Sequence, residues 1–555
     1  MLIRRLIRGK KFIKYYPILF RRLYGRENND FYENDNRKRD VGRTTAFVLG
    51  SVLIAGAVKE QLQKKENEEV LPLPKEKVVV AGEKKPGLPT FTAEEVSKHD
   101  SKSSFWVTYK HGVYDVTPFL ASHPGGEQIY NAAGLSIEPF WNVYGMHKTP
   151  EVFALLESLR IGNLADADVA DYGDDELWAR EPYRDRRLIL KTARPFNAET
   201  PPKQQVDHFD TPNELFYVRQ HMPVPELDAR THQLQVMVRL GEGERRFQFS
   251  LGELEQFPSV TVRAALMCAG NRRSEMNAQV KPVKGLSWAG GAISNAVWGG
   301  VRLRDVLLHC GLGDVDPTDL HVILTGADVD ATGVNFSTSI PLHMALDPTA
   351  DILLATQMNG TALPLDHGYP LRAVVPGAAA VRSVKWLESI TISKEESPSH
   401  WHQKDYRSFN ASKTWETADF STAPPIYHLP VTSYVCEPAD GEYVPVRDGH
   451  VLLRGYAYSG GGAKIVRVDV SSDRGRSWSE AELQTDSAAP RRHYSWTLWS
   501  LQLPVQPRQE DVEIWVKATD SNFNTQPETF ENIWNIRGIL SNAYHRIHIH
   551  LKHET

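Results

Sequence analysis

The sequence predicts a multidomain protein, in which a small α+β domain precedes a larger mixed α+β domain and an all-β C-terminal domain. The chain of 555 residues is longer than one domain usually is, and its 41% apolar content is enough for several cores. Two highly charged stretches, 59–90 and 163–179, interrupt the apolar patterning. After about residue 408, runs of alternating polar and apolar residues recur, as in a β-sandwich.

The charge balance and the cysteines exclude several classes of protein. With 64 basic and 69 acidic residues the net charge is −5, so the overall charge does not indicate a nucleic-acid binder. The three cysteines, Cys268, Cys310 and Cys436, are odd in number and far apart, which excludes a complete disulfide framework and a metal cage made of cysteine alone. A cysteine with a chemical role would therefore act alone.

Residues 1–85 are predicted to be a presequence, an apolar sorting segment and a linker. Nine Lys or Arg and no acidic residue lie between Met1 and Arg26, a composition typical of mitochondrial targeting sequences. The apolar run TTAFVLGSVLIAGAV (44–58) is short of the roughly 20 residues that span a bilayer. It is either a marginal membrane anchor or a signal that directs the chain to the mitochondrial intermembrane space and is then removed. We favour the second interpretation and expect no stable anchor after processing.

The small domain is expected at 86–162. Thr92 and Glu95 have the spacing of a capping box, which predicts the start of a helix. The run FWVTYKHGVYDV (105–116) predicts a hairpin that turns at His111 and Gly112. Six acidic residues and no basic one follow in 163–179, the pattern of a solvated hinge whose charges repel one another.

The larger domain is expected at 180–407 and the C-terminal domain at 408–555. Gly and Pro separate short β-branched runs such as QLQVMVRL (233–240) and LRAVVPG (371–377), which predicts a mixed α+β structure. The later runs AKIVRVDVSSDRGRSW (463–478) and DVEIWVKATD (511–520) predict strands of a sandwich. The final HRIHIHL (545–551) alternates polar and apolar residues and predicts a half-buried strand.

Two histidines of the small domain, His123 and His147, have the pattern of haem ligands. His123 precedes a Pro-Gly-Gly turn, and His147 follows the aromatic residues Phe140, Trp141 and Tyr144. A planar porphyrin with both axial positions filled needs two imidazoles that arrive from opposite sides. The segment resembles cytochrome b5. This resemblance implies a haem b that carries one electron at a time and whose iron no substrate reaches.

The second chemical motif is AALMCAGNRRSEM (264–276), which contains Cys268. An isolated cysteine is more often a small buried apolar residue than a reactive one. Here Arg272 and Arg273 follow closely and are expected to lower the pKa of the thiol. A thiolate beside arginines suits a transition metal that receives an anionic substrate.

Several long strings resemble the sulfite oxidase family, from about residue 86 to the C-terminus. Besides the cysteine motif they include FYVRQHMPVP (216–225), DHGYPLRAVVPG (366–377) and IWNIRGILSNAYHRI (533–547). The resemblance implies a cytochrome b5-like domain, then a molybdopterin domain with the sulfite oxidase fold, then an immunoglobulin-like domain. It also implies a homodimer formed through the C-terminal domain.

The resemblance further implies roles for individual residues. Cys268 would be the thiolate ligand of molybdenum in a Mo-molybdopterin cofactor. The residues that would hold the pterin and phosphate are Phe216, Tyr217, Val218, Arg219, Gln220, Asp328, His367, Arg372, Ser383, Val384 and Lys385. Those that would line the substrate pocket are Arg219, Arg273, Arg537 and Trp288. Thr356, a candidate catalytic residue, stands where we expect related enzymes to carry a tyrosine beside the metal, a departure that concerns the rate of internal electron transfer more than the type of reaction.

The implied activity is oxidation of sulfite to sulfate at the molybdenum, with single electrons leaving through the His123/His147 haem to cytochrome c. One alternative is a nitrate-reducing enzyme of the same molybdenum fold, which is expected to carry its haem domain after the molybdenum domain and a flavin domain after that. Another is a haem electron carrier without catalysis, which would leave Cys268 and its neighbouring arginines unexplained.

Overall fold

The computed structural model describes residues 80–123, 126–170, 172, 178, 181–241 and 243–553. The predicted presequence and apolar segment therefore lie outside the described residues, as does most of the acidic stretch after residue 170. No helix within the described ranges is long and apolar enough to cross a membrane. Contacts group 80–136 with 148–169 in one unit, and 137–147 with the chain from 170 onward in a second, larger unit.

The small unit is built around a five-stranded sheet in the order β1-β5-β4-β3-β2. The strands are β1 (Thr90–Phe91), β2 (Asp100–Ser101), β3 (Ser104–Tyr109), β4 (Gly112–Asp115) and β5 (Arg160–Leu164). The helices are α2 (Ala93–Ser97), η2 (Thr117–Ser122), η3 (Gly126–Ala132) and α4 (Pro150–Ser158). The capping box of Thr92 and Glu95 is present as predicted. The hairpin turns one residue earlier than predicted, at Lys110 and His111, where Lys110 has a φ of 49°.

The first part of the predicted hinge belongs to the small unit. β5 extends to Leu164, and the turn η5 (Asp166–Asp168) follows it directly. Asp166 forms an ion pair with Lys84 at 2.7 Å, and the Ala93 N–H donates to Asp168 at 2.9 Å. Because these carboxylates have partners within the unit, the small unit ends near Val169 rather than at residue 162.

Two helices that the sequence assigned to the small domain, α3 (Glu138–Val143) and η4 (Gly145–His147), group with the larger unit. Val143 belongs to the main apolar core of that unit. The indole Nε1 of the buried Trp178 donates to the Asn142 carbonyl at 2.6 Å. Residues 137–147 therefore pack with the larger unit, although in sequence they lie within the small domain.

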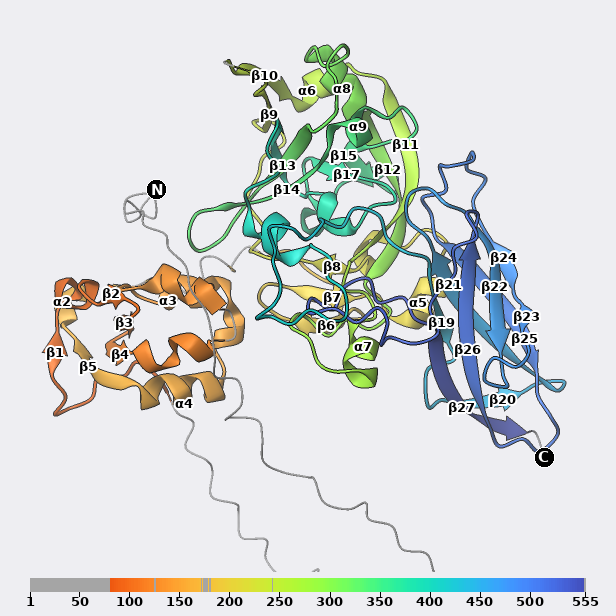
Figure 1. Ribbon diagram of the computed structural model, residues 1–555, viewed down its shortest axis with the longest axis horizontal. Coiled ribbons are helices and arrows are strands. Elements are labelled where there is room, and N and C mark those ends of the chain that lie inside the picture. The colour runs from red at the N-terminus through yellow and green to blue at the C-terminus, as the bar shows by residue number, and fades with distance from the viewer. Residues whose placement is uncertain are drawn as a thin grey trace, which may run out of the picture. The chain divides into compact units, whose positions relative to one another are not determined.

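Three sheets form the predicted second domain (Figure 1). One has the order β10-β9-β18-β13-β14 and contains β9 (Gln233–Val238), β10 (Arg245–Ser250), β13 (His321–Val329), β14 (Asn335–Pro341) and β18 (Leu387–Ser393). Another has the order β11-β12-β15-β16, with β17 on β15, and contains β11 (Ser259–Met267), β12 (Ile293–Arg302), β15 (Leu353–Met358), β16 (Thr361–Ala362) and β17 (Arg372–Val374). The third contains β6 (Ile189–Thr192), β7 (Asn197–Glu199) and β8 (Val218–Arg219).

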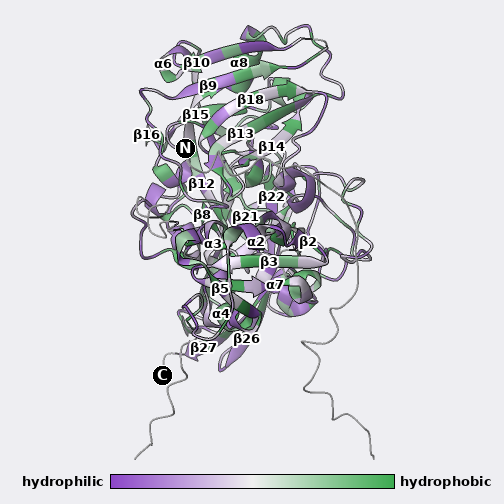
Figure 2. Ribbon diagram, turned by 90° about the vertical axis from the view of Figure 1, so that its left-hand side faces the viewer, coloured by the Kyte–Doolittle hydropathy of each residue, from purple (hydrophilic) through white to green (hydrophobic). Residues whose placement is uncertain are grey.

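Short helices connect these strands. They are α5 (Pro202–Asp207), η6 (Asn213–Leu215), α6 (Leu251–Leu254), α7 (Arg273–Gln279), α8 (Leu303–His309), α9 (Leu342–Leu346), η7 (Leu365–His367), η8 (Ala380–Arg382) and the π-helix η9 (Trp401–Asp405). In Figure 2 green, apolar residues recur along β13, consistent with the alternating burial of Val322 and Leu324. These side chains belong to the core that α8 and α9 also enter.

The C-terminal domain is a sandwich of two sheets, drawn in blue in Figure 1. One contains β19 (Thr432–Glu437), β21 (His450–Tyr458), β24 (Glu482–Gln484) and β25 (Thr497–Pro504). The other contains β20 (Tyr443–Val446), β22 (Ile465–Ser471), β23 (Ser479–Glu480), β26 (Asp511–Asp520) and β27 (His545–His553). One apolar core draws on both sheets. β27 is half-buried as predicted, with Ile547, Ile549 and Leu551 inward.

Candidate functional site

A cavity of about 710 Å³, partly open to solvent, lies where strands of the second domain end. Of the residues expected to hold a cofactor or a metal here, eleven line it: Phe216, Tyr217, Arg219, Gln220, Cys268, Asp328, His367, Arg372, Ser383, Val384 and Lys385. Val218, which was also expected, is buried in β8 beside them without lining the cavity. Segments 216–220, 366–372 and 383–385 are far apart in sequence, so the fold has brought them together.

Cys268 reaches the cavity because it directly follows β11. Its N–H donates to the Ala292 carbonyl at 2.9 Å and its own carbonyl accepts from Asn271 at 3.0 Å, which fixes the turn. All three cysteines are buried free thiols, but burial raises the pKa of Cys310 to about 11 and that of Cys436 further still. Of the three, only Cys268 lines the described cavity.

The two arginines after Cys268 have different roles, which corrects one expectation. Arg272 is fully buried, donates to Glu275 at 2.6 and 2.7 Å, and reaches the C-terminal domain through the Ser433 carbonyl at 3.1 Å. Its backbone is left-handed, with a φ of 64°, and its guanidinium also donates to the Thr432 hydroxyl at 3.3 Å. Arg272 therefore joins two domains, and the electrostatic partner of Cys268 is Arg273.

Arg273 is held by two backbone carbonyls, Gly538 at 2.8 Å and Leu286 at 2.7 Å. Burial lowers the pKa of Arg273, and the positive charges of Arg537 and Arg219 lower it further. Cys268 and Tyr406 raise it. A Cβ on Gly270 would lie 2.5 Å from the Arg273 Nη2. A larger residue at 270 would therefore force the Arg273 guanidinium to move from its place under the turn.

Arg273, Arg537 and Trp288 all lie outside the lining of the described cavity. Arg537 donates to the Asp405 carboxylate at 2.6 Å and to its carbonyl at 3.1 Å. Trp288 is fully buried in the apolar cluster that contains Cys268. All three lie beside residues of the site, and their expected contact with substrate remains a prediction.

The polar end of the cavity collects positive charge. Arg372 donates to the carbonyls of His367 at 2.8 Å and Ser383 at 3.0 Å, and burial lowers its pKa to about 10. The Lys385 ammonium donates to the Asp366 carbonyl at 2.8 Å, and burial lowers its pKa to about 7. Buried cations held by carbonyls suit an anionic group such as a phosphate.

Asp328 needs a hydrogen-bond donor rather than an anion. Its Oδ1 is buried and has no hydrogen-bond partner, and burial raises the pKa of the carboxyl to about 7. A buried acceptor without a donor is costly unless a ligand supplies one. The free thiol, the cations and this acceptor together fit a molybdenum-pterin cofactor, whose metal, phosphate and ring N–H groups need those three kinds of partner.

Among the lining residues that the sequence did not predict, three are titratable: His221, Asp366 and Tyr406. Asp366 accepts two hydrogen bonds from Arg184, both at 2.8 Å, and one from Gln220 at 2.5 Å. His221 and Asp366 directly adjoin expected residues, so extending each motif by one position would have found them. Tyr406 has no such local signal.

The prediction for Thr356 is corrected by the structure. Thr356 is not among the residues that line the described cavity, and its carbonyl accepts from the Leu363 N–H at 3.1 Å. The neighbouring Ala355 packs in the same apolar cluster as Cys268. Because successive side chains of a strand point to opposite faces, Thr356 points away from the thiol. Two tyrosines line the cavity: Tyr217, which was expected, and Tyr406, which was not.

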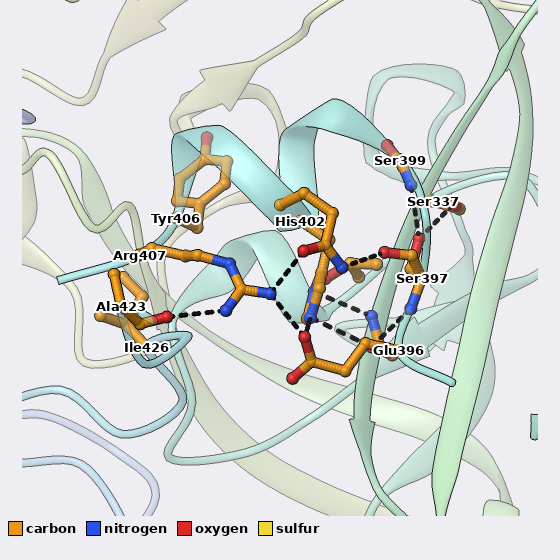
Figure 3. A network of polar contacts seen from close by, with 12 residues as sticks. Ser337, Glu396, Ser397, Ser399, His402, Tyr406, Arg407, Ala423 and Ile426 are labelled. Atoms are coloured by element: carbon orange, nitrogen blue, oxygen red, sulfur yellow. Dashed lines mark hydrogen bonds and ion pairs between the residues drawn. The ribbon is translucent and has the colours of Figure 1, made fainter. Parts of the chain in front are cut away.

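A buried polar network supports Tyr406 (Figure 3). Tyr406 directly follows the π-helix η9, in which His402 is fully buried. The His402 ring contacts Arg382 at 2.7 Å and Thr338 at 3.1 Å, and Arg382 also donates to the Ile426 carbonyl at 2.7 Å. Arg382 immediately precedes the cavity residue Ser383, so one network supports both walls.

The two histidines expected to bind haem each have a fixed ring. The Nδ1 of His123 lies 3.3 Å from the Gly126 carbonyl, and the Nδ1 of His147 lies 2.9 Å from the Tyr144 carbonyl. Such a bond places the proton on Nδ1 and the metal-binding lone pair on Nε2. His147 also stacks on Trp141, with ring centroids 5.5 Å apart. The two histidines fall in different units of the structure.

Family models match all three domains. A cytochrome b5-like heme/steroid binding domain matches residues 92–165, an oxidoreductase molybdopterin binding domain matches 221–401, and a Mo-co oxidoreductase dimerisation domain matches 423–552. The predicted order of three domains is confirmed by these matches.

Two similar proteins cover most of the chain. Mitochondrial sulfite oxidase of Drosophila melanogaster is 50% identical over 472 residues, 83% of this chain and 81% of that protein. Sulfite oxidase of Gallus gallus is 47% identical over 466 residues, 83% of this chain and all of that protein. Nitrate reductase of Solanum lycopersicum is 36% identical over 68% of this chain but only 42% of its own length.

A solved structure shares the fold. The sulfane dehydrogenase SoxCD from Paracoccus pantotrophus has a TM-score of 0.54 and 24% identity, covering 67% of this chain and 94% of that one. This likeness concerns the arrangement of the strands and helices in the larger part of the molecule.

Proposed function

The chain belongs to the sulfite oxidase family, and on that premise we propose that it oxidises sulfite to sulfate at a molybdenum-pterin centre and passes the electrons singly through a b-type haem to cytochrome c. The observation that carries the proposal is the free thiol of Cys268 in a cavity that Arg372, Lys385 and Asp328 also line, with the Asp328 Oδ1 lacking a hydrogen-bond partner. This arrangement would provide a ligand for the metal, cations for the phosphate and an acceptor for a pterin N–H.

The residues have distinct parts in binding the cofactor. Cys268 would ligate molybdenum, Arg372 and Lys385 would neutralise the phosphate, and the Asp328 Oδ1 would accept from a pterin N–H. When bound, the molybdenum-pterin group supplies oxygen-atom transfer to sulfur and accepts two electrons. Cys268, Arg372 and Asp328 are buried, which excludes bulk water from them and strengthens their electrostatic contacts.

The chain's own contribution to the reaction is to bind and orient an anion. Sulfite and water yield sulfate, two electrons and two protons, so the substrate and product are both oxyanions. Arg219 lines the cavity beside Cys268, and Tyr406 adds a hydroxyl. Arg273 and Arg537 would raise the local positive potential. Rigid guanidinium groups suit oxyanions better than a lysine does.

The path of the electrons and the location of the protein extend this proposal. His123 and His147 would bind the haem through Nε2, and a haem with two axial ligands transfers electrons without binding substrate. The basic composition of residues 1–26 and the names of mitochondrial relatives support a mitochondrial protein. Cytochrome c as acceptor would place it in the intermembrane space. The match to a dimerisation domain at 423–552 supports a homodimer.

The two alternatives are weaker. The similarity to nitrate reductase is lower in identity and covers less than half of that protein. A haem carrier without catalysis would leave unexplained why Cys268 lines a cavity with buried cations.

The test is anaerobic addition of sulfite to the full chain loaded with both cofactors, while the haem absorption bands are followed. We expect the haem to become reduced. The variant Cys268→Ser should abolish reduction, whereas Cys310→Ala, which removes a thiol from the apolar core, should retain it. If sulfite reduces neither the haem nor an added redox dye, the proposal is wrong; re-oxidation of reduced haem by nitrate would favour the nitrate-reducing alternative.

A further inference from the structure

His221 and Tyr406 meet at the wall of the cavity. Both line it, and the His221 Nε2 lies 3.2 Å from the Tyr406 hydroxyl. They come from separate segments, His221 from the chain just after β8 and Tyr406 from the end of η9. The hydrogen bond is thus made by tertiary packing at the place where Arg219 also faces the cavity.

Aromatic side chains fix the His221 ring. It stacks on Phe336, with ring centroids 5.0 Å apart, and meets the edges of Trp401 at 6.1 Å and Tyr406 at 6.3 Å. Phe336 belongs to the main apolar core. This packing holds the imidazole in an orientation that points Nε2 at the Tyr406 hydroxyl.

The surroundings also fix its protonation. Burial lowers the pKa of His221 well below its usual value, and Arg219, Lys385 and His400 all act in the same direction. A neutral imidazole has one N–H and one lone pair, so Nε2 either donates to the phenol oxygen or accepts from the phenol O–H.

These two arrangements have different consequences for an anion in the cavity. If Nε2 accepted the phenol proton, Tyr406 would present only lone pairs to the oxyanion. If Nε2–H donates to the phenol oxygen, the Tyr406 O–H is available to donate to the oxyanion. A cavity that carries Arg219, Arg372 and Lys385 is built for anions, which favours the second arrangement.

We propose that His221 is a positioning residue, whose Nε2–H donates to the Tyr406 oxygen and thereby directs the Tyr406 O–H at the oxyanion substrate. This inference rests on the proposed function for the identity of the oxyanion. His221 acts through Tyr406, so its effect should exist only when the Tyr406 hydroxyl is present.

The test is a double-mutant cycle with sulfate as the probe, measured by calorimetric titration of the oxidised, cofactor-loaded full chain without turnover. His221→Phe and Tyr406→Phe should each weaken sulfate binding roughly tenfold, the loss expected for one hydrogen bond to a charged group. The double variant should bind no more weakly than Tyr406→Phe alone. His221→Gln should restore most of the affinity, because its amide places a donor near the Nε2 position.

His232→Gln is the matched control. His232 is also buried and its Nε2 lies 2.9 Å from the Leu387 carbonyl, but it does not line the cavity. Its sulfate affinity should equal that of the wild type, and thermal unfolding should show that all variants are folded. Additive losses in the double variant, or an unchanged affinity of His221→Phe, would overturn the role of His221.

The same variants separate this inference from the proposed function. Sulfite-dependent haem reduction tests the proposed function, and the sulfate cycle tests His221 whether or not sulfite is oxidised. In turnover, His221→Phe should raise KM for sulfite more than it lowers kcat, a division that general destabilisation would not produce.

Discussion

Asp328 and Lys385 are buried charges of opposite sign at the polar end of the cavity, and burial dominates the pKa of each. The pKa of the Asp328 carboxyl is raised from 3.8 to about 7. The pKa of the Lys385 ammonium is lowered from 10.5 to about 7. Such a pair stores an electrostatic cost that a bound cofactor can relieve, since Asp328 gains a donor and Lys385 gains an anion.

This pair predicts how the stability of the cofactor-free protein depends on pH. Because folding raises the pKa of Asp328, the folded state retains a proton that the unfolded chain has released, and stability should fall between about pH 4 and pH 7. Lys385 acts oppositely above pH 7, where its lowered pKa makes stability rise with pH.

Asp328→Asn should therefore flatten the loss of stability between about pH 4 and pH 7, measured by urea unfolding followed by tryptophan fluorescence. The exposed Asp314→Asn is the control and should retain the wild-type slope. Identical slopes in the wild type and in Asp328→Asn would show that this carboxyl does not titrate as inferred.

At the scale of elements, turns and strand ends position the site. The turn after β11 presents Cys268 and, through the space left by Gly270, admits the Arg273 guanidinium. The π-helix η9 presents Tyr406 at its end, and π-helical turns are frequent at functional sites. Regular strands supply the rigid support, and residues near the strand ends and in the segments between strands line the cavity.

The turn makes a specific prediction. Gly270→Ala places a Cβ 2.5 Å from the Arg273 Nη2, so the guanidinium must move. We expect a severalfold rise in KM for sulfite with retained fold and molybdenum content, measured by steady-state kinetics and metal analysis. Gly313→Ala is the control, because its Cβ would meet only the Leu308 Cδ2 at 3.6 Å, an ordinary contact. Equal KM values in both variants would exclude the proposed role of the turn.

At the scale of the whole molecule, the predicted acidic hinge connects the small unit to the chain that follows it. The unit ends near Val169, so the six acidic residues predicted as one hinge divide between the unit and the link that follows it. Asp166 and Asp168 have partners in the small unit, whereas Asp171, Asp174, Asp175 and Glu176 of the predicted hinge lie outside the described residues. We propose that this link allows the haem to approach the molybdenum centre and then its electron acceptor.

A Pro-rich replacement of residues 170–177 tests this role. It should slow sulfite-dependent haem reduction, because proline stiffens a linker, and leave dye-coupled sulfite oxidation unchanged. A Gly/Ser replacement of equal length removes the charge without stiffening and should retain fast haem reduction. If the Pro-rich variant reduces its haem as fast as the wild type, the link has no such function.

Much of the fold and of the site follows from local sequence. Residues that are neighbours in the chain determine the capping box of Thr92 and Glu95 and the strand of 545–551. The order of the three domains likewise follows from motifs that are contiguous in the chain. The same is true of the cofactor residues in 216–220 and 383–385, because a contiguous motif carries its own turn geometry. Cys268 was found in this way.

The remainder depended on contacts between distant segments. By itself the sequence determined the domain order, the thiol and the motifs that surround the cavity. Only the tertiary structure decided that Tyr406, and not the residue at 356, lines the cavity, that Arg273 and not Arg272 accompanies the thiol, and that His221 contacts the Tyr406 hydroxyl. The physical reason is that the packing of the sheets determines which face of a strand points into the cavity. It also determines which distant side chains come into contact.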